Sequence, residues 1–142
     1  SGDVAVLDAL GSLFLRAGRL PEAEARALEA HELIPDHESA IELLTMISIE
    51  SKDDEAGLRW STMLTDLSPE YSTAQWWHAY FLSRHGRTQD AISCAHRALE
   101  VNPLQQDARR LLIQLLTSTG KRDEAARHQE ILTELQERLP LP

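Results

Sequence analysis

Apolar residues recur along the chain at intervals of three and four positions, the spacing of one face of an α-helix. Leu7, Leu10 and Phe14 show this spacing in the first run, and similar runs follow at regular distances. Each run predicts an amphipathic helix with one apolar stripe. Because β-branched residues are scattered rather than clustered, the pattern favours an all-α chain over one that contains strands.

The residues between these runs repeat with a period of 34 positions. Proline stands at 35, 69 and 103, and glycine at 18, 86 and 120, with Lys52 at the vacant glycine place. A fixed period of this length is typical of repeat proteins. We therefore divide the chain into four units of two helices each, over residues 4–37, 38–71, 72–105 and 106–139.

The first unit shows the chemistry that the turns and packing of such a pair require. Gly18 tolerates positive φ and suits the end of the first helix. Pro21 stands in the first turn of the second helix, where its missing N–H costs nothing. Ala23, Ala27 and Ala30 form a stripe of methyl groups that lets two helices come close.

The second unit fits the period less well. Aligning it on Ala56 rather than on Gly57 places Trp60 at an apolar position, and this slipped register is the one we prefer. It implies one residue lost before Ala56 and one gained before Pro69. It also leaves Ser51, not glycine, at the turn, so we expect that turn to differ in shape.

These residues resemble the tetratricopeptide repeat (TPR) family. The first unit supplies Leu7, Leu10-Gly11, Phe14, Gly18, Ala23, Ala27, Ala30 and Pro35 of the family pattern. The third supplies Ala79, Leu82, Gly86, Ala91, Ala95, Ala98 and Pro103, and the fourth Leu112, Leu116, Gly120, Ala125 and Leu132. The resemblance implies an all-α, right-handed α-α superhelix of four TPR-like helix pairs, about eight antiparallel helices, as a single domain over residues 1–142.

By the same resemblance, the first helix of each unit lines a concave groove that binds a peptide or protein segment. The residues that we expect to contact a partner are Asp8, Ser12, Glu42, Met46, Trp76, Trp77, Tyr80, Arg84, Arg110 and Gln114. Adjacent helical residues point about 100° apart, so the aromatic residues within 76–81 cannot all face one core, and we expect at least one of them to reach the groove. The alternative is that both tryptophans fill the space left by Gln75 and His78, and the sequence leaves open which of Trp76 and Trp77 is core.

Charge and composition exclude several other partners. The 23 acidic and 14 basic residues give a formal charge of −9, which would repel a nucleic acid. No apolar run is long enough for a membrane span, so we expect no membrane insertion. Cys94 is the only cysteine and can form no disulfide within the chain. We expect a soluble protein, in a bacterial cytoplasm rather than a periplasm.

The chemistry of the side chains predicts no catalysis. Six histidines are present, but no two form an i, i+4 pair on one predicted helix, so we expect no metal site. No glycine-rich phosphate loop follows a strand, and no cofactor is expected. We therefore predict a module that binds proteins and is not an enzyme.

Two alternatives stay open. The chain can be a regulatory or targeting domain of a larger bacterial enzyme, or of a secretion or envelope-assembly protein. It can also be a scaffold that self-associates into a homo-oligomer through its apolar ends. Ser1-Gly2 resembles a remnant of tag removal, and we expect the sequence to be a fragment of a longer protein.

Overall fold

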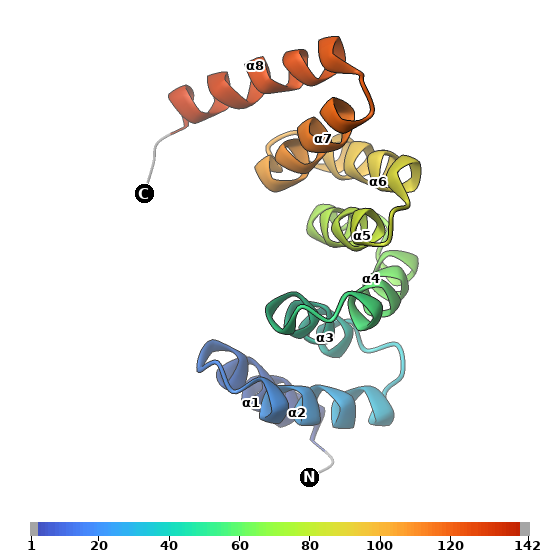
Figure 1. Cartoon of the computed structure of the whole chain (residues 1–142). Coiled ribbons are helices and arrows are strands. Elements are labelled where there is room, and N and C mark those ends of the chain that lie inside the picture. The colour runs from blue at the N-terminus through green and yellow to red at the C-terminus, as the bar shows by residue number, and fades with distance from the viewer. Residues whose placement is uncertain (1–2, 140–142) are drawn as a thin grey trace. The chain divides into compact units, whose positions relative to one another are not determined.

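The computed structural model describes residues 3–139, and over that range the chain is all helix, with no strand (Figure 1). The eight helices are α1 (Val4–Arg16), α2 (Leu20–Leu33), α3 (Glu38–Ser51), α4 (Asp54–Leu67), α5 (Ser72–Arg84), α6 (Thr88–Val101), α7 (Gln106–Ser118) and α8 (Arg122–Arg138). The all-α fold of four helix pairs predicted from the sequence is confirmed. The proposed tag remnant at residues 1–2 lies outside the described residues.

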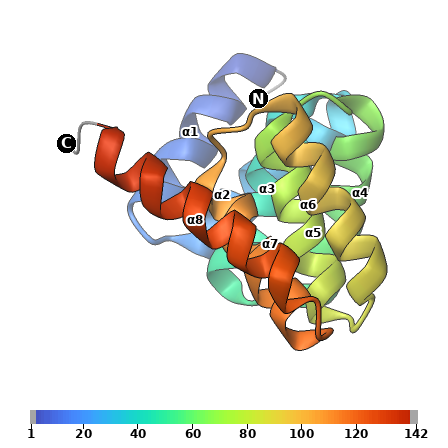
Figure 2. The ribbon, with the colours of Figure 1, turned by 90° about the horizontal axis from the view of Figure 1, so that it is seen from above.

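Contacts between helices divide the chain into two compact units, Ser1–Pro69 and Glu70–Pro142. In the first unit α1 packs on α2, α2 on α3 and α3 on α4, and α1 also contacts α3. The second unit repeats this arrangement with α5 to α8 in the same roles. Figure 2 shows α5 and α6, the two helices of one pair, side by side. Each unit is thus two helix pairs stacked on each other.

The helices follow the 34-residue period without a break, and the slipped register of the second unit is wrong. The first helices begin at 4, 38, 72 and 106, and the second helices at 20, 54, 88 and 122. Gly57 is buried at the place that Ala23, Ala91 and Ala125 occupy, whereas Ala56 is only half-buried. Every unit thus places a small buried residue here, and Gly57 is that residue in the second unit.

The turn inside each pair has the same shape in all four cases. Gly18, Gly86 and Gly120 adopt φ of 75°, 73° and 82°, and Lys52 adopts φ of 59°. The N–H of the residue after this positive-φ position then bonds back to a carbonyl in the last turn of the helix, as from Arg19 to Phe14 O at 2.9 Å. This is the Schellman arrangement, which satisfies carbonyls at a helix end. Lys52, not Ser51, therefore fills the glycine place.

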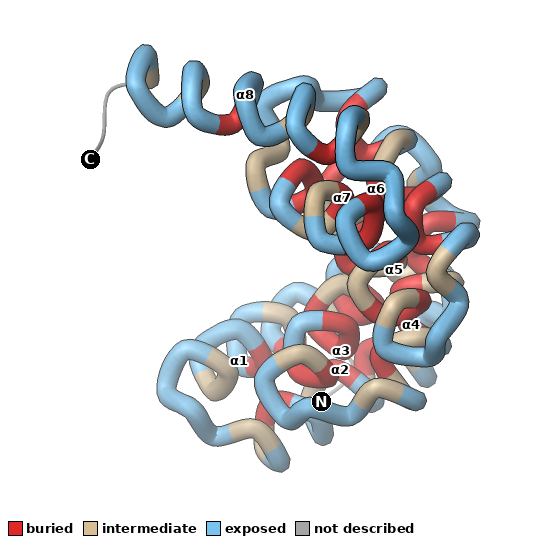
Figure 3. The backbone as a smooth tube through the Cα atoms, turned by 45° about the horizontal axis from the view of Figure 1, so that its top comes forward, coloured by how far each residue is buried: buried red, intermediate tan, exposed pale blue. Residues whose placement is uncertain are grey.

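Buried residues recur at fixed positions of the period and form the core of each unit (Figure 3). In the first unit Leu7, Ala30 and Ala40 form a buried cluster from three helices, with Val4 packed against it. Gly11 is a close-approach point, because a Cβ there would collide with the side chain of Leu43. The alanines and this glycine keep the helix axes close, as the sequence predicts.

Candidate functional site

One face of α5 carries a line of large side chains at four-residue intervals. Trp76 and Tyr80 are half-buried and Arg84 is exposed. The ring of Tyr80 stands edge-on to buried Phe81, with ring centroids 5.1 Å apart. Partial burial holds these aromatic rings in place while part of each stays accessible, which is the condition for a contact residue.

Trp77 does not belong to that accessible line, and its assignment as a partner-contacting residue is corrected here. Its exposed fraction is 6%, and it meets the ring of Tyr71 edge-on at 6.2 Å. It shares a helix face with buried Ala74 and Phe81, three residues before it and four after it. Trp77 is therefore the core tryptophan of the adjacent pair, and Trp76 is the one that partly faces outward.

The corresponding positions on α7 are polar. Arg110 and Gln114, which stand 34 residues after Trp76 and Tyr80, are both exposed. Arg110 donates to Asp107 and to Gln106, at 3.2 Å in each case. Since α5 contacts α7, these side chains extend the same surface. We define the α5–α7 surface as Trp76, Tyr80, Arg84, Arg110 and Gln114.

Hydrogen bonds fix α5 against its neighbours and so position this surface. The hydroxyl of Ser72 donates to the carbonyl of Ala98 on α6 at 2.8 Å, and both residues are buried. The side-chain amide of Gln105 donates to the hydroxyl of Thr73 at 3.3 Å. The start of α5 is thereby tied to α6 and to the residue that precedes α7. Trp76 and Tyr80 therefore lie on a helix whose start is held in place by these hydrogen bonds.

The predicted contact residues of the first unit form a separate surface on α1 and α3. Ser12 and Met46 are exposed, and Asp8 and Glu42 are half-buried. The carboxylate of Asp8 lies 2.7 Å from Nε2 of His37, at the start of α3. The sequence did not indicate this contact, because 29 residues separate the partners. Asp8 is therefore engaged in holding α1 to α3.

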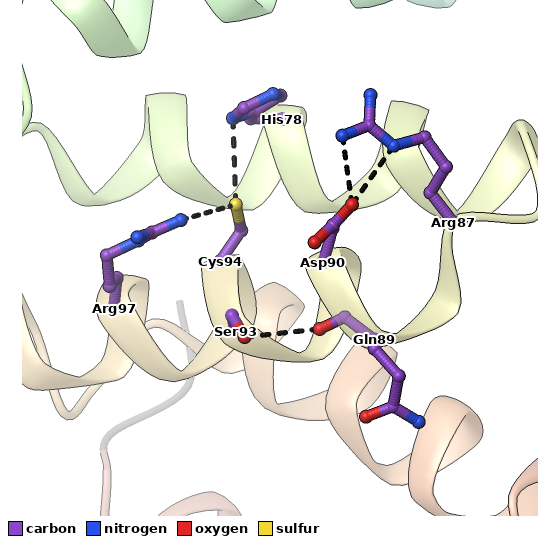
Figure 4. A network of polar contacts seen from close by, with 7 residues as sticks. All are labelled: His78, Arg87, Gln89, Asp90, Ser93, Cys94 and Arg97. Atoms are coloured by element: carbon purple, nitrogen blue, oxygen red, sulfur yellow. Dashed lines mark hydrogen bonds and ion pairs between the residues drawn. The ribbon is translucent and has the colours of Figure 1, made fainter.

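A second polar cluster surrounds Cys94 on α6 (Figure 4). A guanidinium nitrogen of Arg97 donates to its sulfur at 3.1 Å, and Nδ1 of His78 lies 3.6 Å from the same sulfur. Beside it Arg87 donates twice to Asp90, at 2.9 and 3.0 Å. These residues line an open pocket of about 320 Å³. The sequence did not indicate that His78, on the neighbouring helix α5, lies beside Cys94.

A third cluster joins α7 to α8 around a buried cation. Arg109 is buried, and its guanidinium donates to Nδ1 of His128 at 2.8 Å and to the carbonyl of Pro103 at 2.9 Å. Burial lowers the pKa of Arg109. Burial also lowers the pKa of His128, with Arg109 adding to the effect and Glu124 opposing it. Because Nδ1 accepts from Arg109, the imidazole is neutral in this arrangement. The cluster therefore helps to hold α7 against α8.

Within residues 3–139 no group of three or more His, Cys, Asp or Glu side chains is placed to hold a metal ion. The ring of His31 packs edge-on against Trp60 at 5.1 Å. Over the same range no helix has the length and apolar character needed to cross a membrane.

Comparison with known proteins agrees with this architecture. Residues 78–137 match the tetratricopeptide repeat family. MamA from Desulfovibrio magneticus RS-1 superposes with a TM-score of 0.91 at 16% identity, over 99% of this chain and 80% of that one. MamA AMB-1 superposes with a TM-score of 0.85 at 19% identity, over 98% and 76%. No curated protein sequence matches the chain.

One similar structure belongs to an enzyme. The Thermobaculum terrenum O-GlcNAc transferase superposes with a TM-score of 0.72 at 20% identity, over 80% of this chain but only 22% of that one. At these identities the likeness concerns the fold. The resemblance drawn from the repeat pattern is confirmed by the family match and by the shared fold.

Proposed function

We propose that this chain, whose fold and residues 78–137 are those of tetratricopeptide repeats, is a protein-interaction module without catalytic activity. It binds a peptide or protein segment through the first helices of its units. The observation that carries this proposal is the line of Trp76, Tyr80 and Arg84 on α5. The two aromatic side chains are half-buried and Arg84 is exposed. Hydrogen bonds to neighbouring segments, such as that from Ser72 to the carbonyl of Ala98, hold α5 in place.

The α5–α7 surface has the composition of a binding hot spot. Tryptophan, tyrosine and arginine are the side chains most enriched at such sites. Two ordered aromatic rings lose little freedom on binding and offer a large apolar area. Arg84 supplies a donor fork for a carbonyl or carboxylate one turn further along. We infer a partner segment with apolar anchor residues that insert beside Trp76 and Tyr80.

The first-unit surface adds a preference of charge. Asp8 and Glu42 are acidic, and Met46 is an adaptable apolar contact between polar neighbours. With a formal charge of −9 on the whole chain, a segment that combines apolar anchors with basic residues is favoured over an acidic one. The preference is electrostatic, and salt weakens it.

A selection from a displayed peptide library tests this proposal. Peptides are selected on the native chain, and their affinities are then measured by fluorescence anisotropy for three proteins. These are the native chain, the double variant Trp76→Ala with Tyr80→Ala, and a control with Val101→Ala and Leu104→Ala. The control removes two exposed apolar side chains from the end of α6 and the loop beyond it, within the same unit.

We expect the selected peptides to bind the double variant at least about tenfold more weakly, since two hot-spot residues are lost. The control keeps native affinity. Equal affinity for the native chain and the Trp76–Tyr80 variant, with unchanged helical circular dichroism, places binding elsewhere and contradicts the proposal.

A second candidate is that the same module serves as a regulatory or targeting domain of a larger enzyme. The observation in its favour is the match to the O-GlcNAc transferase, in which the matched part is 22% of the chain. Adding the domain in trans to the enzyme encoded with it, and measuring turnover, distinguishes this role from recognition of a separate partner.

A further inference from the structure

The open pocket between α5 and α6 departs from the repeat pattern of the chain. His78, which lines it, stands at the place that Leu10, Leu44 and Leu112 occupy in the other three helix pairs. Leu44 and Leu112 are buried there, so this place serves apolar packing elsewhere in the chain. An imidazole with two polar nitrogen atoms is not explained by that role.

Arg97, also at this pocket, is a second departure. The other helix pairs hold at its place, in chain order, Glu29, Met63 and Ile131. In the first pair the carboxylate of Glu29 lies 3.6 Å from the guanidinium of Arg26, and Cys94 stands at the place of Arg26. The pair of α5 and α6 thus has a cation where the pair of α1 and α2 has a carboxylate, and a thiol where that pair has a guanidinium.

The two unusual side chains meet at one sulfur atom, as Figure 4 shows. A guanidinium nitrogen of Arg97 donates to Sγ of Cys94 at 3.1 Å, and Nδ1 of His78 lies 3.6 Å from the same sulfur. When the thiol donates to Nδ1, the neutral imidazole carries its proton on Nε2, which is then a donor. Sulfur is a weak acceptor, so it engages only a small part of the donor fork of Arg97. His78 and Arg97 therefore bring hydrogen-bond donors to this pocket.

The pocket has more positive than negative charge. Arg87 and Asp90 also line it, and they pair with each other at 2.9 and 3.0 Å. The same ion pair recurs as Arg19 with Glu22 in the first helix pair, so it belongs to the repeat and not to the pocket. Within residues 3–139 no carboxylate pairs with Arg97. The charge of Arg97 is thus left for an anion from outside the chain.

The net charge of the chain does not oppose an anion at this place. Residues 1–69 hold 14 acidic and 5 basic residues, whereas residues 70–142 hold nine of each. The formal charge of −9 therefore lies on the first compact unit. The second compact unit, which contains the pocket, carries no net formal charge.

We propose that this pocket binds a phosphate group held between Arg97 and His78. A tetrahedral oxyanion offers acceptors in several directions, so it can accept from the fork of Arg97 and from Nε2 of His78 together. A pocket of about 320 Å³ admits a small phosphate ester as well as the ion. The group comes either from a free small molecule or from a phosphorylated side chain of a partner.

This site is independent of the proposed function. His78 is two residues from both Trp76 and Tyr80, so at 100° per residue it lies about 160° around α5 from each of them. The phosphate site and the α5–α7 surface are therefore on opposite sides of α5. The loss of one site by mutation leaves the other in place.

Titration of the native chain with sodium phosphate, followed by ¹H–¹⁵N NMR at constant ionic strength, tests the proposal. We expect amide shifts around His78, Cys94 and Arg97 that saturate with a dissociation constant on the order of 1 mM, which is within reach of a five-atom ion. Sodium chloride at the same ionic strength produces no saturating shifts there.

Two variants restore residues that other helix pairs already hold at these places. Arg97→Met introduces the residue of the second pair, and His78→Leu that of the other three pairs, so both keep the repeat pattern. We expect phosphate to bind at least about tenfold more weakly to Arg97→Met and about threefold more weakly to His78→Leu. Arg122→Met is the matched control, because it removes an exposed arginine from the start of α8 in the same compact unit. It keeps native affinity.

A short peptide with one phosphoserine between alanines, and its serine counterpart, distinguish the two sources of the group. Tighter binding of the phosphopeptide than of inorganic phosphate assigns the ligand to a partner's side chain, and the reverse assigns it to a free molecule. The absence of saturating shifts around the pocket overturns the proposal. So does native affinity in Arg97→Met, or an equal loss in Arg122→Met, since phosphate would then bind to positive charge in general.

Discussion

Lys52 adopts the left-handed backbone conformation, with φ of 59°, at the place that Gly18 occupies one unit earlier with φ of 75°. Both turns close with the same hydrogen bond, from Asp53 N–H to Ser48 O at 3.0 Å and from Arg19 N–H to Phe14 O at 2.9 Å. A Cβ is disfavoured in this conformation by about 1–2 kcal/mol. Lys52 therefore carries strain that glycine avoids.

Lys52→Gly is expected to stabilise the chain by about 0.5–1 kcal/mol, because the relief of strain exceeds the extra entropy of glycine in the unfolded state. Urea unfolding followed by circular dichroism measures the change. Gly18→Lys is the reciprocal control and loses a similar amount. A lower urea midpoint for Lys52→Gly would show that the lysine side chain itself stabilises the turn.

The second-unit turn also shows what the sequence could predict and what it could not. The 34-residue spacing of the prolines and glycines was enough to predict the helix pairs and where each pair begins. The register of the second unit was misjudged because the apolar pattern around Trp60 outweighed the position of Lys52. The register of the second unit is set by the left-handed backbone conformation of Lys52 and not by the chemistry of its side chain. Residues other than glycine can adopt this conformation at some cost in free energy.

The polar clusters were out of reach of sequence reasoning for a different reason. Cys94 meets His78, and Arg109 meets His128, across 16 and 19 residues and between different helices. Periodicity predicts which face of a helix is buried, but the rotation of one helix against another decides which polar side chains meet. The 100° step per residue puts Trp76 and Trp77 on different faces of α5, and the packing of that helix decides which of the two is buried.

Truncation of the two adjacent tryptophans is expected to destabilise the chain to different extents. Trp77→Ala removes a buried side chain and should cost about 3–5 kcal/mol of unfolding free energy. Trp76→Ala removes a half-exposed one and should cost about 1 kcal/mol or less. Urea unfolding of both variants gives the comparison. Equal losses would mean that the two side chains share the core.

Cys94 is expected to react slowly in the folded chain. Its sulfur is buried and contacts Arg97 and His78, so a bulky thiol reagent must wait for local opening. The rate of labelling by an aromatic disulfide reagent should be at least about tenfold lower in the native protein than in concentrated urea. Leu104→Cys in a Cys94→Ser background is the exposed control. Equal native rates for the two thiols would show that the pocket admits the reagent.

Stability is expected to fall in mild acid because of His128. Its pKa lies below the ordinary value of 6.5, so in that range the unfolded state binds a proton that the folded state does not. The stabilisation is complete above pH 6.5 and is lost as the pH falls through the folded-state pKa. Protonation would also remove the acceptor for Arg109, while Arg127 and His96 add positive charge nearby and Glu124 opposes them.

His128→Gln keeps an acceptor for Arg109 and does not titrate. The urea midpoint of the native chain should therefore drop more than that of His128→Gln between about pH 7.5 and about pH 5. Parallel drops would assign the acid sensitivity to other groups.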